Sequence, residues 1–303
     1  MPPAIPPPLV SYLESSLASL HGQTLITSVL GTPSPWLLLR FVYGAMYGVG
    51  HDSEARQLGE DSAVRPGESP VVFGLDFQVL LRGKKIVYVD GLTDGSPPAG
   101  PGNSSLPPTT KLKALTLDEL RRSMDVALKS WFTATTDTST SGVGASSGSS
   151  SSAGSADAKS LILLDGIDFL LACQPFISTV SLQALLSTLR TRSRALVLTC
   201  NADAPLLQTA TSGNHDGGTP LERNHAHFLT SIAHQSRWVF QLRGLDTGSA
   251  KDVSGVIRVS KGGDGGDGEN EISTSGRTTD LPDTEWLYQL KGDGSVRVWG
   301  RGE

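Results

Sequence analysis

Five stretches of this 303-residue chain are dominated by Gly, Ser, Thr, Pro and Asp, and they limit how much of it can form a packed core. Such segments bury too little apolar surface to offset the conformational entropy that is lost when they become ordered. We therefore expect flexible insertions in a single domain spanning 1–303, with about 200 residues left to fold. The stretches are residues 48–70, 95–110, 133–159, 208–220 and 261–280.

Between these stretches, short apolar runs typical of strands alternate with longer segments that have helical periodicity. This alternation predicts an α/β fold with a mostly parallel central sheet flanked by helices. The runs 256–260 and 286–300, the second interrupted by Gly-Asp-Gly, predict antiparallel C-terminal hairpins. The expected strands are 25–31, 71–77, 85–91 (a central strand), 161–166, 195–200 and 238–244, and the expected helices are 8–20, 36–47, 116–131, 176–189 and 221–235.

The charge balance and the cysteines narrow the class of protein. A net charge of −5 argues against a chain that holds nucleic acid by itself, because phosphate binding draws on Lys and Arg. Cys173 and Cys200 lie in apolar stretches without a metal-ligand spacing, so both are predicted to be buried free thiols. The N-terminus lacks the pattern of a signal peptide and no apolar run approaches the length of a membrane span. We expect a soluble intracellular protein without membrane contact.

The segment after the expected strand 25–31 occupies the place of a phosphate-binding loop. Counted from Gly31 as the first glycine of that motif, the positions that need Gly, Lys and Ser or Thr hold Trp36, Leu37 and Leu38. Pro33 and Pro35 remove two of the backbone N–H donors that a phosphate would use. The location is that of a phosphate loop, but the residues cannot supply its chemistry, and no bound cofactor is expected.

Other residues have the local pattern of catalytic groups without their usual companions. Asp165 and Asp90 each end an apolar run, as does the Walker B aspartate that acts on magnesium in an ATPase, although an aspartate capping a turn before glycine has the same pattern. Asp246-Thr-Gly resembles half of an aspartic protease site, or else a simple turn. The spacing of His225, His227 and His234 on one expected helix predicts hydrogen-bonded or exposed helix histidines, with a metal site as the less favoured alternative. Arg190, Arg192 and Arg194 precede a strand and are predicted to lie in a solvated turn.

Several blocks of the sequence are similar to a known family. KIVYVDGLTDG at 85–95, LILLDGIDFLLA at 161–172, residues 221–263 and the ending WLYQLKGDGSVRVWGRG resemble the sixth subunit of the Elongator complex in its fungal form, and LLLRFVYGAM at 37–46 agrees. The resemblance implies a RecA-like fold that has lost the Walker A motif. It further implies a heterohexameric ring with two copies each of the fourth, fifth and sixth subunits.

The resemblance also implies a function and a set of partners. The ring binds tRNA and releases it in an ATP-dependent way, within a complex that modifies the wobble uridine (U34) at carbon 5. The chemistry belongs to the catalytic subcomplex, so this chain would be a non-catalytic subunit located in the cytoplasm, with the nucleus as a second location. The alternative is an ATPase of RecA type with a divergent phosphate loop.

The RecA analogy further implies which surfaces are used. The loop 201–220 would face the pore and the RNA, with His215 and Arg223 as candidate contacts. The apolar helix 36–47 and the hairpin residues Trp286, Tyr288 and Trp299 would either contact neighbouring subunits or belong to the core.

Overall fold

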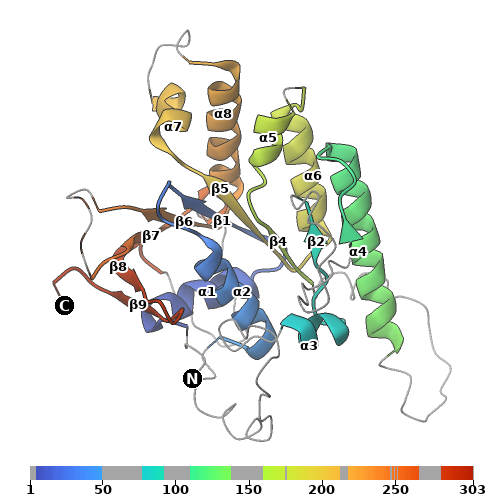
Figure 1. Cartoon of the computed structure of the whole chain (residues 1–303), viewed down its shortest axis with the longest axis horizontal. Helices are drawn as coiled ribbons and strands as arrows, with labels where there is room; N and C mark the ends of the chain where they lie inside the picture. Colours follow the sequence, from blue (N-terminus) through green and yellow to red (C-terminus); the bar gives the residue numbers. More distant parts are fainter. Residues whose placement is uncertain are drawn as a thin grey trace, which may run out of the picture. The chain divides into compact units, whose positions relative to one another are not determined.

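The computed structural model of the 303-residue chain divides into two compact units (Figure 1). Unit 1 comprises residues 57–157 together with Met1, and unit 2 comprises residues 2–56 and 158–303. The residues that the structure describes are 5–49, 77–91, 110–137, 160–174, 176–211, 218–245, 248, 250, 252–265 and 281–302.

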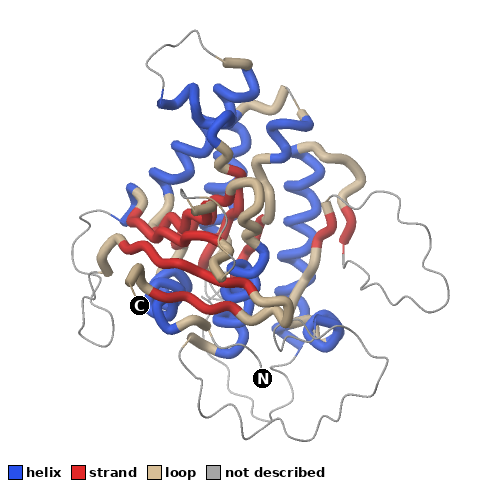
Figure 2. The backbone as a smooth tube through the Cα atoms, turned by 60° about the vertical axis from the view of Figure 1, so that its left-hand side comes forward, coloured by secondary structure: helices blue, strands red, loops and turns tan. Residues whose placement is uncertain are grey.

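Unit 2 is built on a mixed seven-stranded sheet, which confirms the predicted α/β architecture. The strand order is β4-β5-β1-β6-β7-β8-β9. The first four strands are parallel, and β7, β8 and β9 continue the sheet antiparallel. Figure 2, in which the left-hand side of Figure 1 comes forward, shows the C-terminal strands running side by side. The strands are β1 Gly22–Ser28, β4 Leu161–Leu164, β5 Ala195–Asn201, β6 Trp238–Arg243, β7 Gly255–Lys261, β8 Thr284–Leu290 and β9 Val296–Trp299.

Helices lie on both faces of this sheet. Side chains alternate between the faces of a strand, so neighbouring residues of β1 point to opposite sides. The amide of Gln23 donates to Ser236 at the end of α8, whereas Thr24 is in register with Trp238, whose ring contacts Tyr12 of α1. The helices of unit 2 are η1 Pro7–Leu9, α1 Val10–Ala18, α2 Pro35–Tyr47, α5 Phe169–Cys173, α6 Thr179–Thr191, α7 Ala204–Thr211, α8 Pro220–Gln235 and η4 Gly263–Gly265.

Aromatic contacts join α1 and α2 to the C-terminal half of the sheet. Trp36 of α2 lies against Tyr288 of β8, with ring centroids 5.2 Å apart, and Phe41 meets Phe240 of β6 edge to face at 5.7 Å. Tyr12 contacts both Trp238 and Trp286. Such contacts bury large apolar surfaces and fix ring orientation. The helix 36–47 and the hairpin residues Trp286 and Tyr288 therefore pack into the core of unit 2.

The element boundaries differ from the prediction where loops meet the sheet. The strand predicted over 25–31 is shifted to Gly22–Ser28, because Gly22 and Gln23 already pair with β5 and Val29 begins a turn. The helix predicted from Phe176 begins at Thr179, and Phe176 is 96% exposed. The short helix α5 was not predicted. Its five residues are too few to show a helical period.

Unit 1 corrects the prediction of a central strand over 85–91. Only Val89–Asp90 form a strand, β2, which pairs with β3 (Thr110–Lys111) in a separate two-stranded sheet. The reason is the preceding helix α3 (Phe77–Arg82), whose carbonyl at Leu80 accepts from the N–H groups of Lys85 and Ile86. The predicted strand 71–77 lies outside the described residues except for Phe77, which begins α3.

The second helix of unit 1, α4 (Leu117–Asp137), confirms the helix predicted over 116–131. At its start, Glu119 N–H donates to Thr116 Oγ1 at 3.3 Å, and the Glu119 carboxylate accepts from Lys113 N–H at 3.4 Å. The helix buries its apolar side at Leu120, Met124, Ala127 and Leu128.

The Gly- and Ser-rich stretches lie largely outside the described residues. Where they are described, several ends belong to regular elements: 133–137 continue α4, 208–211 end α7, and 263–265 form η4. Their flexibility, and the single domain that they were expected to interrupt, stay predictions. Within the described part of the chain, no helix is both long and apolar enough to cross a membrane.

Candidate functional site

The carboxyl ends of β4, β5 and β1 meet at one edge of the sheet of unit 2, because these neighbouring strands are parallel. In open α/β sheets this edge is where ligands bind. Three features gather there: the loop after β1, Asp165 after β4, and a buried aspartate–histidine pair.

The loop after β1 has the sharp turn of a phosphate-binding loop. Its conformation is fixed by hydrogen bonds between the Thr32 side chain and the loop's own backbone. Gly31 has a φ of +87°, a conformation that glycine adopts without strain. The Thr32 hydroxyl donates to Val29 O at 2.8 Å and accepts from Val29 N–H at 3.1 Å. Leu30 N–H, in turn, donates to the Asp203 carboxylate at 2.8 Å. Thr32 N–H donates to Val29 O at 2.9 Å, so protein groups occupy three of the loop's N–H donors.

The residues at the lysine and hydroxyl positions of this motif point into the core. Leu37 is 0% exposed and Trp36 is 4% exposed, and Leu38 is also buried. The N–H groups of Leu37 and Leu38 donate to Ser34 O at 2.9 and 3.2 Å. The first turn of α2 thus offers apolar side chains to the core and uses these two N–H groups internally.

Helix α2 also carries a buried cation that the sequence analysis missed. Arg40 is 0% exposed, one turn after Leu37 on a helix that otherwise buries apolar side chains. Burial lowers the pKa of its guanidinium to about 10, and the guanidinium therefore stays charged at neutral pH.

Asp165 is exposed and lies at the carboxyl end of β4, where a Walker B aspartate would be. Its carboxylate accepts from the Thr199 hydroxyl of β5 at 2.5 Å, and the same hydroxyl accepts from Gly166 N–H at 2.7 Å. This arrangement ties the turn after β4 to β5 through the Thr199 hydroxyl. Asp90, the other Walker B candidate, lies in β2 of unit 1 and not in the main sheet, so that interpretation of Asp90 is wrong.

A buried pair of titratable side chains lies beside this turn. Asp168 and His225 are 4% and 3% exposed, and His225 Nε2 lies 3.3 Å from Asp168 Oδ2. The same oxygen accepts from the Asn201 backbone N–H at 3.2 Å and from its side-chain amide at 3.0 Å. The pair therefore joins the start of α5, the end of β5 and helix α8 through one carboxylate oxygen.

Sequence reasoning missed this pair because Asp168 and His225 are 57 residues apart. One signal was present: His225 shares the face of α8 that carries the buried residues Phe228, Leu229 and Ile232. A histidine on an apolar face must find a polar partner inside the protein. His227 and His234 are exposed.

The two cysteines have different environments. Cys200 is buried as predicted, and burial, followed by the nearby charge of Asp168, raises the pKa of its thiol well above the usual value. It is therefore a protonated packing residue at neutral pH. Cys173 is exposed, so the prediction that it is buried is wrong. Helix α5 buries Leu170 and Leu171 and turns its last residue toward solvent.

The residues proposed to approach RNA are only partly described. His215 lies outside the described residues, and Arg223 is exposed on the first turn of α8. The first part of the 201–220 segment is not a loop, since Ala204–Thr211 form α7.

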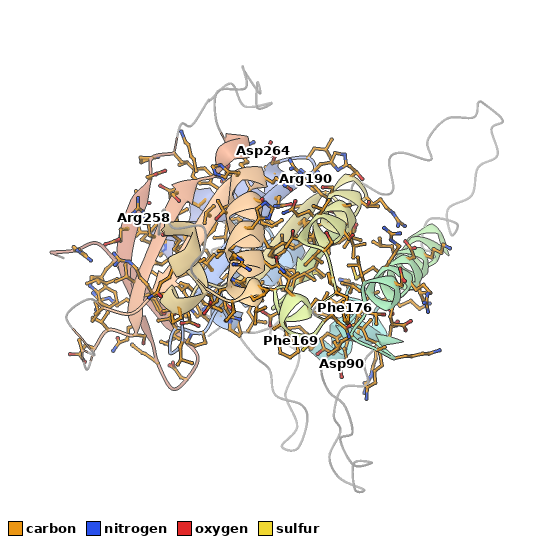
Figure 3. All side chains as sticks on the ribbon, turned by 90° about the horizontal axis from the view of Figure 1, so that it is seen from above. Asp90, Phe169, Phe176, Arg190, Arg258 and Asp264 are labelled. Atoms are coloured by element: carbon orange, nitrogen blue, oxygen red, sulfur yellow. The ribbon has the colours of Figure 1, made fainter. Side chains whose placement is uncertain are left out.

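In the basic turn at 190–194, Arg194 is exposed as predicted, but both it and Arg190 also bind protein groups. Arg190 donates to His21 O at 2.5 Å, to Gln235 O at 3.2 Å and to the Asp264 carboxylate at 2.5 Å, a contact whose two partners are labelled in Figure 3. Arg194 donates to Leu17 O at 3.0 Å. These arginines bind carbonyls at the ends of helices α1 and α8, where positive charge is favourable.

Helix α8, which presents His225, begins with a capping box whose first residue, Thr219, belongs to the stretch 208–220 that is predicted to be an insertion. Glu222 N–H donates to Thr219 Oγ1 at 3.3 Å, and Thr219 N–H donates to the Glu222 carboxylate at 2.5 Å. Thr219→Ala is expected to lower the free energy of unfolding by about 1 kcal/mol, measured by urea denaturation. Thr230→Ala, an exposed position inside the same helix, is the control and should change it by less than about 0.5 kcal/mol. Equal effects would contradict a capping role.

Comparisons with known proteins do not assign a family or a function to this site. No protein-family model matches the chain, and no curated protein matches it significantly. Among the described residues, no group of three or more His, Cys, Asp or Glu side chains is arranged to hold a metal ion.

Proposed function

We propose that this chain is a non-catalytic subunit of the heterohexameric RecA-like ring of Elongator, and that it supports tRNA binding and release during wobble uridine modification. The observation that carries the proposal is the burial of Trp36 and Leu37 at the phosphate-loop position. A strand that leads into a tight turn and then a helix is retained, while the residues that would contact phosphate have become part of the core.

Beyond an α/β architecture, the topology of the sheet supports a RecA-like fold. The parallel strands β4, β5, β1 and β6 place the phosphate-loop position and Asp165 at the same edge, as a nucleotide-binding ancestor would require. The sequence blocks that resemble the sixth Elongator subunit coincide with elements of this sheet, including β4, β6, β7, β8 and β9.

The alternative, an ATPase with a divergent phosphate loop, finds less support. Asp165 would have to hold magnesium, but its carboxylate already accepts from Thr199. A phosphate would have to approach a first helical turn whose side chains Trp36 and Leu37 are buried in the core.

The net charge of −5 bears on how the chain would bind RNA. An acidic chain that shares RNA contacts with neighbouring subunits fits this charge better than a chain that binds RNA alone.

Co-expression with the fourth and fifth Elongator subunits tests the proposal. Native mass spectrometry of the purified complex is expected to give a hexamer with two copies of each subunit, and the ring is expected to bind tRNA. The control is co-expression with either partner alone, which should not give the hexamer. A stable monomer that binds neither partner would contradict the proposed function.

A further inference from the structure

The antiparallel end of the sheet in unit 2 has one face that is rich in arginine. Paired residues of antiparallel strands lie on the same face of a sheet. Gln241 of β6, Arg258 of β7 and Glu285 of β8 are in register with one another, so they share a face. Arg243, Val256, Leu287 and Trp299 form the next row of that face. We call it the arginine face, and it lies opposite the side on which Trp286 and Tyr288 meet α1 and α2.

Among the residues of the arginine face that the structure describes, arginines outnumber carboxylates. Glu285 accepts from Arg243 at 2.7 Å and from Arg301 at 2.9 Å. Because Glu285 is already paired twice, Arg258 opposite it is left exposed, and its side chain forms no hydrogen bond or ion pair within the described part of the chain. Arg297 is also exposed and lies over the ring of Trp299, 5.2 Å from the ring centroid. A local excess of guanidinium groups on a chain of net charge −5 requires an explanation.

The chemistry of this face favours a nucleic acid over a protein partner. The centre of a protein–protein interface is apolar and depleted of charge, whereas interfaces with nucleic acids are more polar and strongly positive. Here the charged side chains of the central strands that reach the surface are Arg243, Arg258 and Glu285. The apolar Val256 between Arg243 and Leu287 is only 1% exposed, and Leu287 and Trp299 lie nearer the edge strand. The cations are all arginine, whose planar guanidinium binds phosphate through two hydrogen bonds.

We propose that the arginine face binds the phosphate backbone of RNA, with Arg258 and Arg297 as the principal contacts. This inference rests on the proposed function, because tRNA is then the RNA that reaches the ring. It adds a surface distinct from the segment around Arg223, since β7 and β9 belong to the antiparallel half of the sheet. Figure 3 shows Arg258 at one end of unit 2 and Phe169 and Phe176 toward the other.

The test is tRNA binding by the ring that contains R258E/R297E, measured by fluorescence anisotropy with a tRNA transcript at several salt concentrations. We expect the ring to assemble normally in native mass spectrometry, with Kd raised at least about tenfold and the slope of log K against log salt reduced by about 2. The matched control is K113E/R121E, two exposed cations of unit 1 whose replacement changes the net charge equally. The control should stay within about twofold of the native ring.

Two results would overturn the inference and leave the proposed function intact. In one, R258E/R297E and the control bind tRNA equally. In the other, R258E/R297E prevents ring assembly, which would assign the arginine face to a contact with a neighbouring subunit.

If the native chain forms no ring, the proposed function fails separately. The tRNA binding of the native chain, R258E/R297E and the control is then compared on the isolated full chain at about 50 mM salt. Loss of binding only in R258E/R297E would then support the RNA contact, and unchanged or absent binding would overturn it.

Discussion

Leu37→Lys, which restores the lysine of a phosphate-binding loop, is expected to destabilise the protein strongly and to give no ATP hydrolysis. Leu37 is 0% exposed, so the new ammonium group would be buried in the apolar contact between α2 and the sheet. It would have to lose its proton or displace the packing of α2. We expect the free energy of unfolding to fall by about 4 kcal/mol, measured by urea denaturation followed by circular dichroism.

Leu39→Lys is the matched control for this experiment. Leu39 lies two residues further along the same helix and is partly exposed, so a lysine there can extend its ammonium group to water. We expect it to lower the free energy of unfolding by about 1 kcal/mol or less. A Leu37→Lys protein that is stable and hydrolyses ATP would show that the phosphate-loop position still works, and would favour the ATPase alternative.

Asp168→Ala is expected to have the second largest effect, because one carboxylate oxygen serves three donors. The substitution would leave His225 Nε2, the Asn201 backbone N–H and the Asn201 amide without their acceptor in a buried place. Unsatisfied buried donors cost more than the hydrogen bonds themselves contribute. We expect a loss of about 3 kcal/mol in the free energy of unfolding, measured by the same denaturation experiment.

Asp165→Ala, three residues earlier, serves as the comparison. Asp165 is exposed and accepts one hydrogen bond, from Thr199, so its removal should cost about 1 kcal/mol or less. Asp168→Asn, which keeps an oxygen acceptor, should fall between the two alanine variants. If Asp168→Ala unfolds at the same urea concentration as Asp165→Ala, the buried pair does not hold these three elements together.

Sequence periodicity predicted the elements that bury a long apolar side. Helices α2 and α8 and strands β5, β6 and β7 lie within a few residues of their predicted positions, and α4 begins where it was predicted but continues to Asp137. Sequence periodicity predicted less where a segment is short, or where a neighbouring element takes the backbone hydrogen bonds that a strand would need. The run at 85–91 has strand composition, yet Lys85 and Ile86 donate to Leu80 of the preceding helix, so only Val89–Asp90 pair.

The candidate site was predicted in part. The positions of Leu37 and Asp165 follow from counting along the chain: Leu37 stands where a phosphate loop has its lysine, and Asp165 follows an apolar strand, as a Walker B or a turn-capping aspartate does. The Asp168–His225 pair and the arginine face were not identified, because each unites residues that are distant in sequence. Arg190 shows the same limit: it was predicted to be solvated, but it binds carbonyl oxygens of two other segments.

The sequence by itself determined which segments could form a core and that the phosphate-loop position carries apolar side chains. Both properties are local, since they depend on residue type and spacing along one strand or helix. Only the tertiary structure decided what those side chains meet. Packing placed Trp36 against Tyr288, joined Asp168 to His225, and left Arg258 and Arg297 exposed on the arginine face. Strand register and helix packing set these contacts, because they bring together side chains that no local pattern relates.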